Sequence, residues 1–148
     1  MREWSSILDN RVLITAAMGW FVAQLMKVVL VWCTGKKLDI SRMVGSGGMP
    51  SSHSAFTTAL MMAIGFQEGF GSPLFALSAV FALVVMYDAA GVRRAAGRQA
   101  VVLNKILQDM LEGGKWLTNE QLKELIGHTP IEVIAGALVG ILVAVLMA

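Results

Sequence analysis

Residues 47–54, Gly-Gly-Met-Pro-Ser-Ser-His-Ser, form a glycine-rich turn that runs into residues 55–66, an apolar segment with a helical pattern. The glycines leave the backbone free to turn its N–H groups toward an anion, and the positive end of the following helix dipole points to the same place. A phosphate bound there would meet backbone donors, the hydroxyl of Ser51 or Ser52, and His53 as a proton donor or acceptor. The alternative interpretation is that one of these serines only caps the helix.

The composition is that of a membrane protein. The chain has 148 residues, of which 56% are hydrophobic, and its length predicts one domain over residues 1–148. The net charge of +2 is small and the basic residues are scattered, so nucleic acid is not an expected partner. Cys33 is the single cysteine, which excludes a disulfide framework or a cysteine zinc site within one chain. The N-terminus lacks the pattern of a cleaved signal, so we expect the first apolar segment to remain in the mature protein.

The hydropathy pattern predicts an all-α fold. Four segments are predicted to cross the bilayer as helices, namely residues 12–33, 55–66, 74–90 and 128–148. The second segment is short, which fits a helix whose N-terminus is recessed within the protein. An amphipathic helix over residues 101–112 is expected on the bundle or along the interface. The prediction is therefore an integral membrane bundle of about four transmembrane helices plus an amphipathic interfacial helix.

The connecting segments contain helix-terminating and helix-capping signals. Residues 34–48 and 67–73 are predicted as a loop and a tight turn, and residues 88–100 are rich in small residues and contain three arginines. A capping box predicts a short helix over residues 118–127. In the last span two glycines, Gly136 and Gly140, have the Gly-x-x-x-Gly spacing that permits close helix contact in membranes.

The predicted topology brings four polar residues to one side of the membrane. With four crossings, the loop before the second span and the segment before the fourth lie on the same side. His53, Arg93, Arg94 and His128 should therefore emerge on one face and form one site.

Lysine at position 27 is unusual because it lies about 9 Å from the end of the first span. It shares a helix face with Gln24, three residues earlier. Two interpretations remain open: Lys27 snorkels to the interface, or the protein holds it for a purpose.

Hydrolysis of a phosphate ester without a metal requires cations around the phosphate, and Lys27, Arg93 and Arg94 could provide them. The alternative for the arginines is a positive-inside topology signal. Asp88 is expected to pair with one of them and orient it toward phosphate.

The two histidines of the chain suit two different catalytic roles. His128 and Glu132 are four residues apart, so the carboxylate can hold one ring nitrogen while the other acts as nucleophile. His53 can then protonate the leaving oxygen. A competing interpretation makes Glu132 part of a capping box with Thr129, with Pro130 at the first helical position. Both interpretations can hold together.

A second chemical hypothesis uses His53, His128 and Glu132 as the ligands of a zinc site. The neighbouring arginines and lysine disfavour it, because they would repel a divalent cation. The prediction is therefore no metal and no cofactor.

Three sequence blocks resemble the signatures of a known superfamily. They are residues 47–55 (GGMPSSHSA), 87–94 (YDAAGVRR) and 127–133 (GHTPIEV). Together they are similar to the divergent branch of the type 2 phosphatidic acid phosphatase and vanadium haloperoxidase superfamily. The likeness extends from about Gln24 to Gly140.

The resemblance implies a set of site residues. It assigns the leaving-group acid to His53, the phosphohistidine nucleophile to His128 and the orienting carboxylate to Glu132, where Asp is usual. It also places Ser52 where the superfamily's block has glycine. The substrate-binding residues would be Gly48, Ser51, Ser52, Lys27, Asp88, Arg93 and Arg94.

Two parts of the superfamily's pattern are not matched in this sequence: the arginine after its lysine, and the arginine shortly before its nucleophilic histidine. Lys27 is followed seven residues later by Thr34 where arginine is usual, which leaves Arg42 as a substitute. Arg93 and Arg94 lie more than thirty residues ahead of His128, where the pattern has an arginine about six residues ahead. The fold must therefore bring the arginine block back to the histidine.

The sequence thus predicts a membrane lipid phosphatase that hydrolyses a lipid phosphate or diphosphate, of the phosphatidate, phosphatidylglycerophosphate or isoprenyl-diphosphate type. The alternative is a non-catalytic protein that binds an anionic lipid head group. Expected partners are the lipid substrate, the bilayer and, for an oligomer, further copies of the chain.

The positive-inside rule places the site of this multi-pass protein toward the cytoplasm. Two arginines, Arg2 and Arg11, lie on the opposite side. The basic residues on the motif side are Lys36, Lys37, Arg42, Arg93, Arg94, Arg98, Lys105, Lys115 and Lys123.

Overall fold

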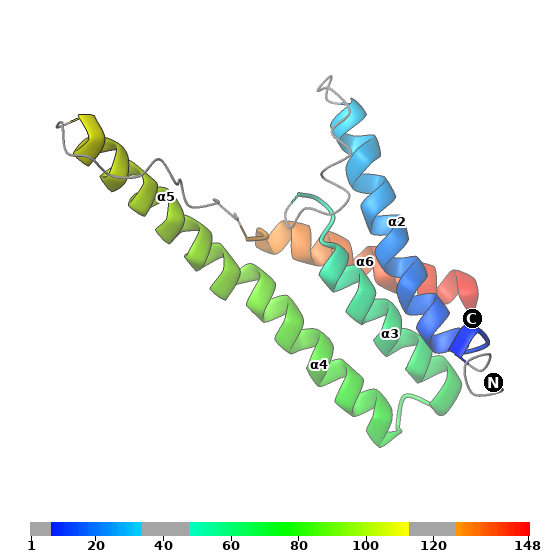
Figure 1. Ribbon diagram of the computed structural model, residues 1–148. Coiled ribbons are helices and arrows are strands. Elements are labelled where there is room, and N and C mark those ends of the chain that lie inside the picture. Colours follow the sequence, from blue (N-terminus) through cyan, green and yellow to red (C-terminus); the bar gives the residue numbers. More distant parts are fainter. Residues whose placement is uncertain (1–6, 34–47, 113–126) are drawn as a thin grey trace.

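The computed structural model describes residues 7–33, 48–112 and 127–148, and within these ranges the regular structure is helical with no strand (Figure 1). The helices are α2 (Arg11–Cys33), α3 (Ser52–Glu68), α4 (Pro73–Ala90), α5 (Val92–Glu112) and α6 (Pro130–Met147). The prediction of an all-α bundle is confirmed. The short helix predicted over residues 118–127 falls almost entirely outside the described residues.

Helix α3 is the centre of the bundle, packing against α6, α2 and α4 (Figure 1). It begins at Ser52 because Ser51 caps it, three residues before the predicted start, and it ends where Gly69 adopts a positive φ of 87°. Ser72 caps α4, and Pro73 takes the first helical position, one residue before the predicted start of this span. Helix α3, which carries His53, therefore packs against three other helices.

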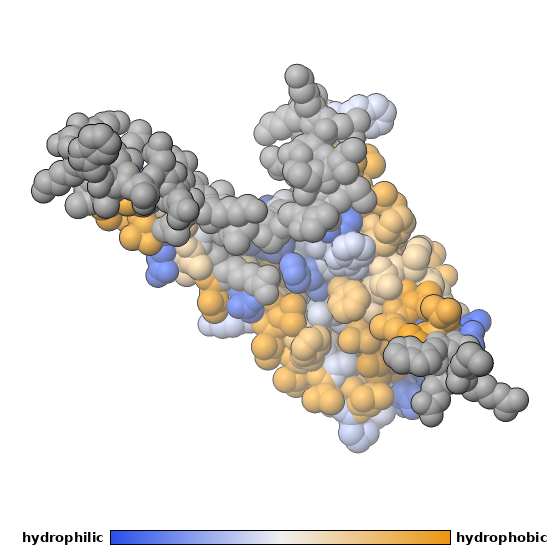
Figure 2. Space-filling view, in the orientation of Figure 1, coloured by the Kyte–Doolittle hydropathy of each residue, from blue (hydrophilic) through white to orange (hydrophobic). Residues whose placement is uncertain are grey.

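The core of the bundle is made of small residues, and large apolar side chains face outward. Ala23, Ala55, Ala59 and Ala82 are completely buried, whereas Leu138 on α6 is 62% exposed. Hydrophobic side chains cover most of the described surface in Figure 2. This arrangement is typical of helices packed in lipid, where close backbone contact replaces the burial of large side chains.

Glycines allow the closest contacts between helices. A Cβ at Gly136 would collide with the Ser51 carbonyl group, and a Cβ at Gly140 would collide with Thr58 Oγ1 and the Ala55 carbonyl oxygen. The close contact predicted from the Gly-x-x-x-Gly spacing is thus made between α6 and the N-terminal half of α3.

Three helical stretches in the described part are long and apolar enough to cross a membrane: Arg11–Cys33, Pro73–Leu107 and Pro130–Met147. Helix α3 is absent from this set because its 17 residues extend only about 26 Å. The sequence predicted four such spans, including one at α3. The difference agrees with the expected shortness of the second segment, which packs against α2, α4 and α6.

Helix α5 begins earlier than predicted, at Val92 instead of residue 101. The backbone hydrogen bonds pass across Gly91, from Gly91 N–H to the Tyr87 carbonyl and from Ala95 N–H to the Gly91 carbonyl. The small residues at 95–96 are alanines, which favour helix. As a result α5 continues the direction of α4 and extends away from the bundle (Figure 1).

Candidate functional site

The turn before α3 is built as a helix cap. Gly48 has a φ of 84°, a conformation that favours glycine, and Met49–Pro50 is a cis peptide. Ser51 is the N-cap: its fully buried hydroxyl accepts hydrogen bonds from the N–H and the hydroxyl of Ser54, at 3.4 and 3.1 Å. The capping interpretation therefore holds for Ser51. Its role toward phosphate stays a prediction, as does that of Gly48.

Ser51 also fixes α3 to α6. Its backbone N–H donates to the carbonyl oxygen of Glu132 at 2.9 Å. The Thr58 hydroxyl, two turns further along α3, lies 2.6 Å from the Ser54 carbonyl oxygen of its own helix and 3.2 Å from the Ala137 carbonyl oxygen of α6, so it shares its one proton between them. These two bonds to α6, with the glycine contacts, set the position of the first turn of α6 relative to the first turn of α3.

Lys27 is held inside the protein. Its side chain is only 3% exposed, and its Nζ donates to the hydroxyl of Ser52 at 3.3 Å. Gln24, one turn away on the same face, is also buried. The structure thus decides against snorkelling and places an ammonium group beside the N-terminus of α3, the end of the helix dipole that attracts anions.

The Glu132 carboxylate has two partners. One oxygen, Oε2, lies 3.1 Å from His128 Nδ1 and accepts a hydrogen bond from the Thr129 N–H at 3.0 Å. The Glu132 N–H donates to Thr129 Oγ1, which completes the capping box. The capping box is therefore formed, and Glu132 also makes the contact with His128 that the orienting interpretation requires. Because an ionised carboxylate only accepts hydrogen bonds, it favours a proton on Nδ1 and leaves Nε2 as the basic nitrogen.

The two imidazoles come together as predicted. The ring centroids of His53 on α3 and His128 in the segment before α6 are 6.2 Å apart. His128 is 3% exposed and its backbone N–H donates to the Ala89 carbonyl oxygen at 3.1 Å. The contact with Ala89 ties the segment before α6 to the end of α4. Sequence reasoning missed this contact, because a backbone carbonyl leaves no signal in side-chain type.

The arginine block begins at this same end of the bundle. Arg93 and Arg94 occupy the first turn of α5, just beyond Ala89, but their side chains lie outside the described residues. Arg98 is exposed on α5, and Asp88 is partly buried near the end of α4. The contribution of these charges to a phosphate site remains a prediction. Arg42, the substitute cation, also falls outside the described ranges.

The zinc hypothesis finds no support in the arrangement of ligands. Among the described residues, which include His53, His128 and Glu132, no three His, Cys, Asp or Glu side chains are grouped to hold a metal ion. Lys27 interacts electrostatically with the Glu132 carboxylate and would compete with a divalent cation. The geometry suits an anionic ligand better.

Two sequence comparisons found proteins that are similar to this chain. A sequence model described as "Divergent PAP2 family" matches residues 8–143. The "Uncharacterized membrane protein YuiD" of Bacillus subtilis (strain 168) is 41% identical over 152 aligned positions, which cover 96% of each chain. No solved structure matches.

Proposed function

The chain belongs to the divergent PAP2 family of membrane proteins, and from this premise we propose that it hydrolyses a lipid phosphate or diphosphate through a phosphohistidine intermediate. The observation that supports the proposal most strongly is the pair of imidazoles, 6.2 Å apart, one of them oriented by a carboxylate. At this spacing both rings can contact one phosphoryl group.

The nucleophile in the proposed reaction is Nε2 of His128. It attacks phosphorus, a new N–P bond forms, and the bond from phosphorus to the leaving oxygen breaks. His53 in its protonated form gives its proton to that oxygen, so the product alcohol leaves neutral. Water then attacks the phosphohistidine while the neutral His53 takes one of its protons, an O–P bond forms, the N–P bond breaks, inorganic phosphate leaves, and both histidines return to their starting states.

Negative charge on the phosphoryl oxygens is compensated by the protein. Lys27 and the N-terminus of α3 supply positive charge on one side, and Ser52 holds the lysine in place. Arg93 and Arg94 are proposed to complete the site from the start of α5. Glu132 orients His128 and stabilises it while it carries the phosphoryl group.

The proposed substrate is a lipid because the site lies at the end of a helix bundle whose outer surface is apolar. A head group can reach the imidazoles while the hydrocarbon chains stay in the bilayer. We place the protein in the cell membrane as a multi-pass protein, with the site toward the cytoplasm on the positive-inside argument.

Phosphate release from a panel of lipid phosphates tests the proposal. The purified protein in detergent with EDTA should release phosphate from at least one of them. His128→Ala should abolish release, and His53→Ala should be less damaging for substrates with good leaving groups. Activity like wild type in His128→Ala would refute the mechanism. If wild type binds lipid phosphates but releases no phosphate from them, the protein is a binding protein instead.

A further inference from the structure

A groove on α3 begins at the candidate site and has apolar walls. It has a volume of about 440 Å³, within the roughly 300–1,000 Å³ that ligand pockets occupy. Its lining residues come from three helices: Trp20 from α2, His53, Phe56 and Thr57 from α3, and Phe81 and Val85 from α4. We refer to it as the chain groove. His53 belongs both to this groove and to the histidine pair.

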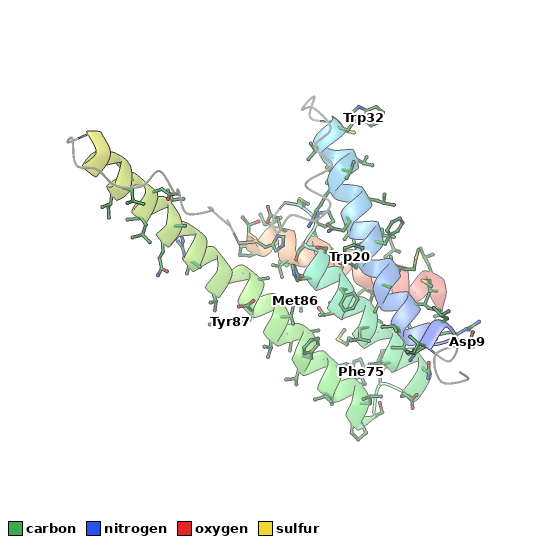
Figure 3. All side chains as sticks on the ribbon, viewed as in Figure 1. Asp9, Trp20, Trp32, Phe75, Met86 and Tyr87 are labelled. Carbon is green, nitrogen blue, oxygen red and sulfur yellow. The ribbon has the colours of Figure 1, made fainter. Side chains whose placement is uncertain are left out.

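The groove runs from the site toward the middle of the bundle. On α4, Val85 and Phe81 lie one and two turns before Ala89, the residue whose carbonyl binds the His128 segment. On α2, Trp20 lies two turns before Lys27, beside α3 in Figure 3. At 1.5 Å per residue, the groove residues on α4 and α2 extend about 10–12 Å along the bundle, measured from Ala89 and Lys27 at the end that carries the candidate site.

The groove opens toward lipid. Helices α2 and α4 both pack on α3 but make no extensive contact with each other, whereas α6 packs against α2, α3 and α4. The side between α2 and α4 is therefore the open one. There Trp20 is 44% and Phe81 51% exposed, so the mouth of the groove faces the surrounding hydrocarbon.

We propose that the chain groove binds the hydrocarbon chain of the substrate, so that a lipid phosphate enters laterally between α2 and α4 with its phosphate at the histidines. This inference rests on the proposed function and adds where the chain lies and how the substrate arrives. The occupant is hydrocarbon because the walls are aromatic and aliphatic, and because the groove is continuous with a site for an anion. A molecule that suits both the apolar groove and the anion site is an amphiphile with a phosphate head group.

Transfer of a chain from bilayer to groove gains little free energy, because both surroundings are apolar. The groove is therefore best probed with monomeric alkyl phosphates delivered from water. For these, each methylene that enters the groove should raise kcat/KM by up to about fourfold. Butyl phosphate and octyl phosphate give a ratio of kcat/KM that measures chain binding.

Val85→Trp fills the groove, and Val84→Trp is its matched control. Val84 is the neighbouring residue on α4, is 60% exposed and does not line the groove. The octyl-to-butyl ratio should fall by at least about tenfold in V85W, equivalent to the loss of roughly two buried methylenes. It should stay within about twofold of wild type in V84W. Equal ratios in the two variants, or equal losses for both substrates in V85W, would overturn the proposal.

A second measurement does not depend on turnover. An alkyl phosphate with a diazirine at the end of its chain is photo-crosslinked to the wild type, V85W, V84W and the His128→Ala variant, and the labelled residues are mapped by mass spectrometry. Labels should fall on residues of the chain groove in all but V85W. Labels spread over the outer face of α6 would refute the groove.

The two measurements separate the inference from the proposed function. Groove-specific labelling without phosphate release from any substrate would refute hydrolysis and support the chain site. Phosphate release with an octyl-to-butyl ratio that V85W leaves unchanged would support hydrolysis and refute the chain site.

Discussion

Replacement of Glu132 by glutamine separates the two roles of this side chain. Glutamine has the same shape and is accepted at the third position of a capping box, so the start of α6 should form normally. The charge beside His128 Nδ1 is lost, however, together with the strict preference for a proton on that nitrogen. Catalysis should therefore fall while the fold persists.

The size of the effect follows from the 3.1 Å contact between Glu132 Oε2 and His128 Nδ1. A hydrogen bond to a charged group contributes about 1.5–3 kcal/mol and a neutral one about 0.5–1.5, a difference of roughly 1–2 kcal/mol. That difference lowers kcat about 5- to 30-fold. A glutamine amide that donates to Nδ1 would place the proton on Nε2, and in serine proteases the wrong tautomer costs about 10⁴. We expect a loss between these limits.

Thr129→Ala is the control, because it removes the other half of the capping box. Thr129 Oγ1 accepts from the Glu132 N–H, and its loss should destabilise the protein by about 1 kcal/mol. The contact between Glu132 and His128 remains, so kcat should change less than about threefold. A tenfold change would need about 1.36 kcal/mol of activation free energy.

The assay is phosphate release in detergent, with thermal unfolding of each variant measured in parallel. Glu132→Gln should lose activity with an unfolding temperature close to wild type, and Thr129→Ala should show the reverse. If Thr129→Ala loses as much activity as Glu132→Gln, Glu132 acts on the site only through the helix cap. That result would refute the orienting role.

Three further predictions follow from the contacts between helices. Lys27→Met should lower kcat/KM about 30-fold, because roughly 2 kcal/mol of phosphate binding is lost. Lys105→Met, a change at an exposed lysine on α5, should leave kcat/KM unchanged. Equal effects of the two substitutions on phosphate release would contradict a phosphate-binding role for Lys27. Gly140→Ala should destabilise the bundle by about 1–3 kcal/mol because its Cβ meets α3, while Gly71→Ala, with open space around its Cβ, should be neutral in the same unfolding assay. Thr58→Val removes a hydroxyl that lies 2.6 Å from the Ser54 carbonyl oxygen and 3.2 Å from the Ala137 carbonyl oxygen of α6. It should cost about 0.6 kcal/mol of unfolding free energy, and no change would show that this hydroxyl is not stabilising.

Local features of this protein could be read from the sequence because they depend on helix periodicity. The pairing of His128 with Glu132 follows from a spacing of four residues, and the capping box follows from Thr129 and Glu132 three apart. The apolar composition required a membrane bundle, and two glycines at a spacing of four predicted a close helix contact. In each case the partners are within four residues of each other in the sequence, or the spacing of residues along one helix face predicts the contact.

Contacts between helices were decided by the tertiary structure. The sequence marked Lys27 as unusual but left open whether it snorkels, and only the packing of α2 on α3 buries it against Ser52. The small residues at 88–100 suggested a long connection between α4 and α5, but only Gly91 separates the two helices. The connection is short because the alanines in this stretch favour helix.

The distance between His53 and His128 also required the fold. Nothing in local periodicity relates a residue on α3 to one in the segment before α6. Their separation of 6.2 Å is set by how closely α3 and α6 approach, which depends on glycines at the contact and on the hydrogen bond from Ser51 to the Glu132 carbonyl. The sequence by itself determined which groups are available for chemistry and on which helical faces they lie. The packing of small residues around α3 decided which of those groups meet, because interhelical distances depend on side-chain volume at every contact along both helices.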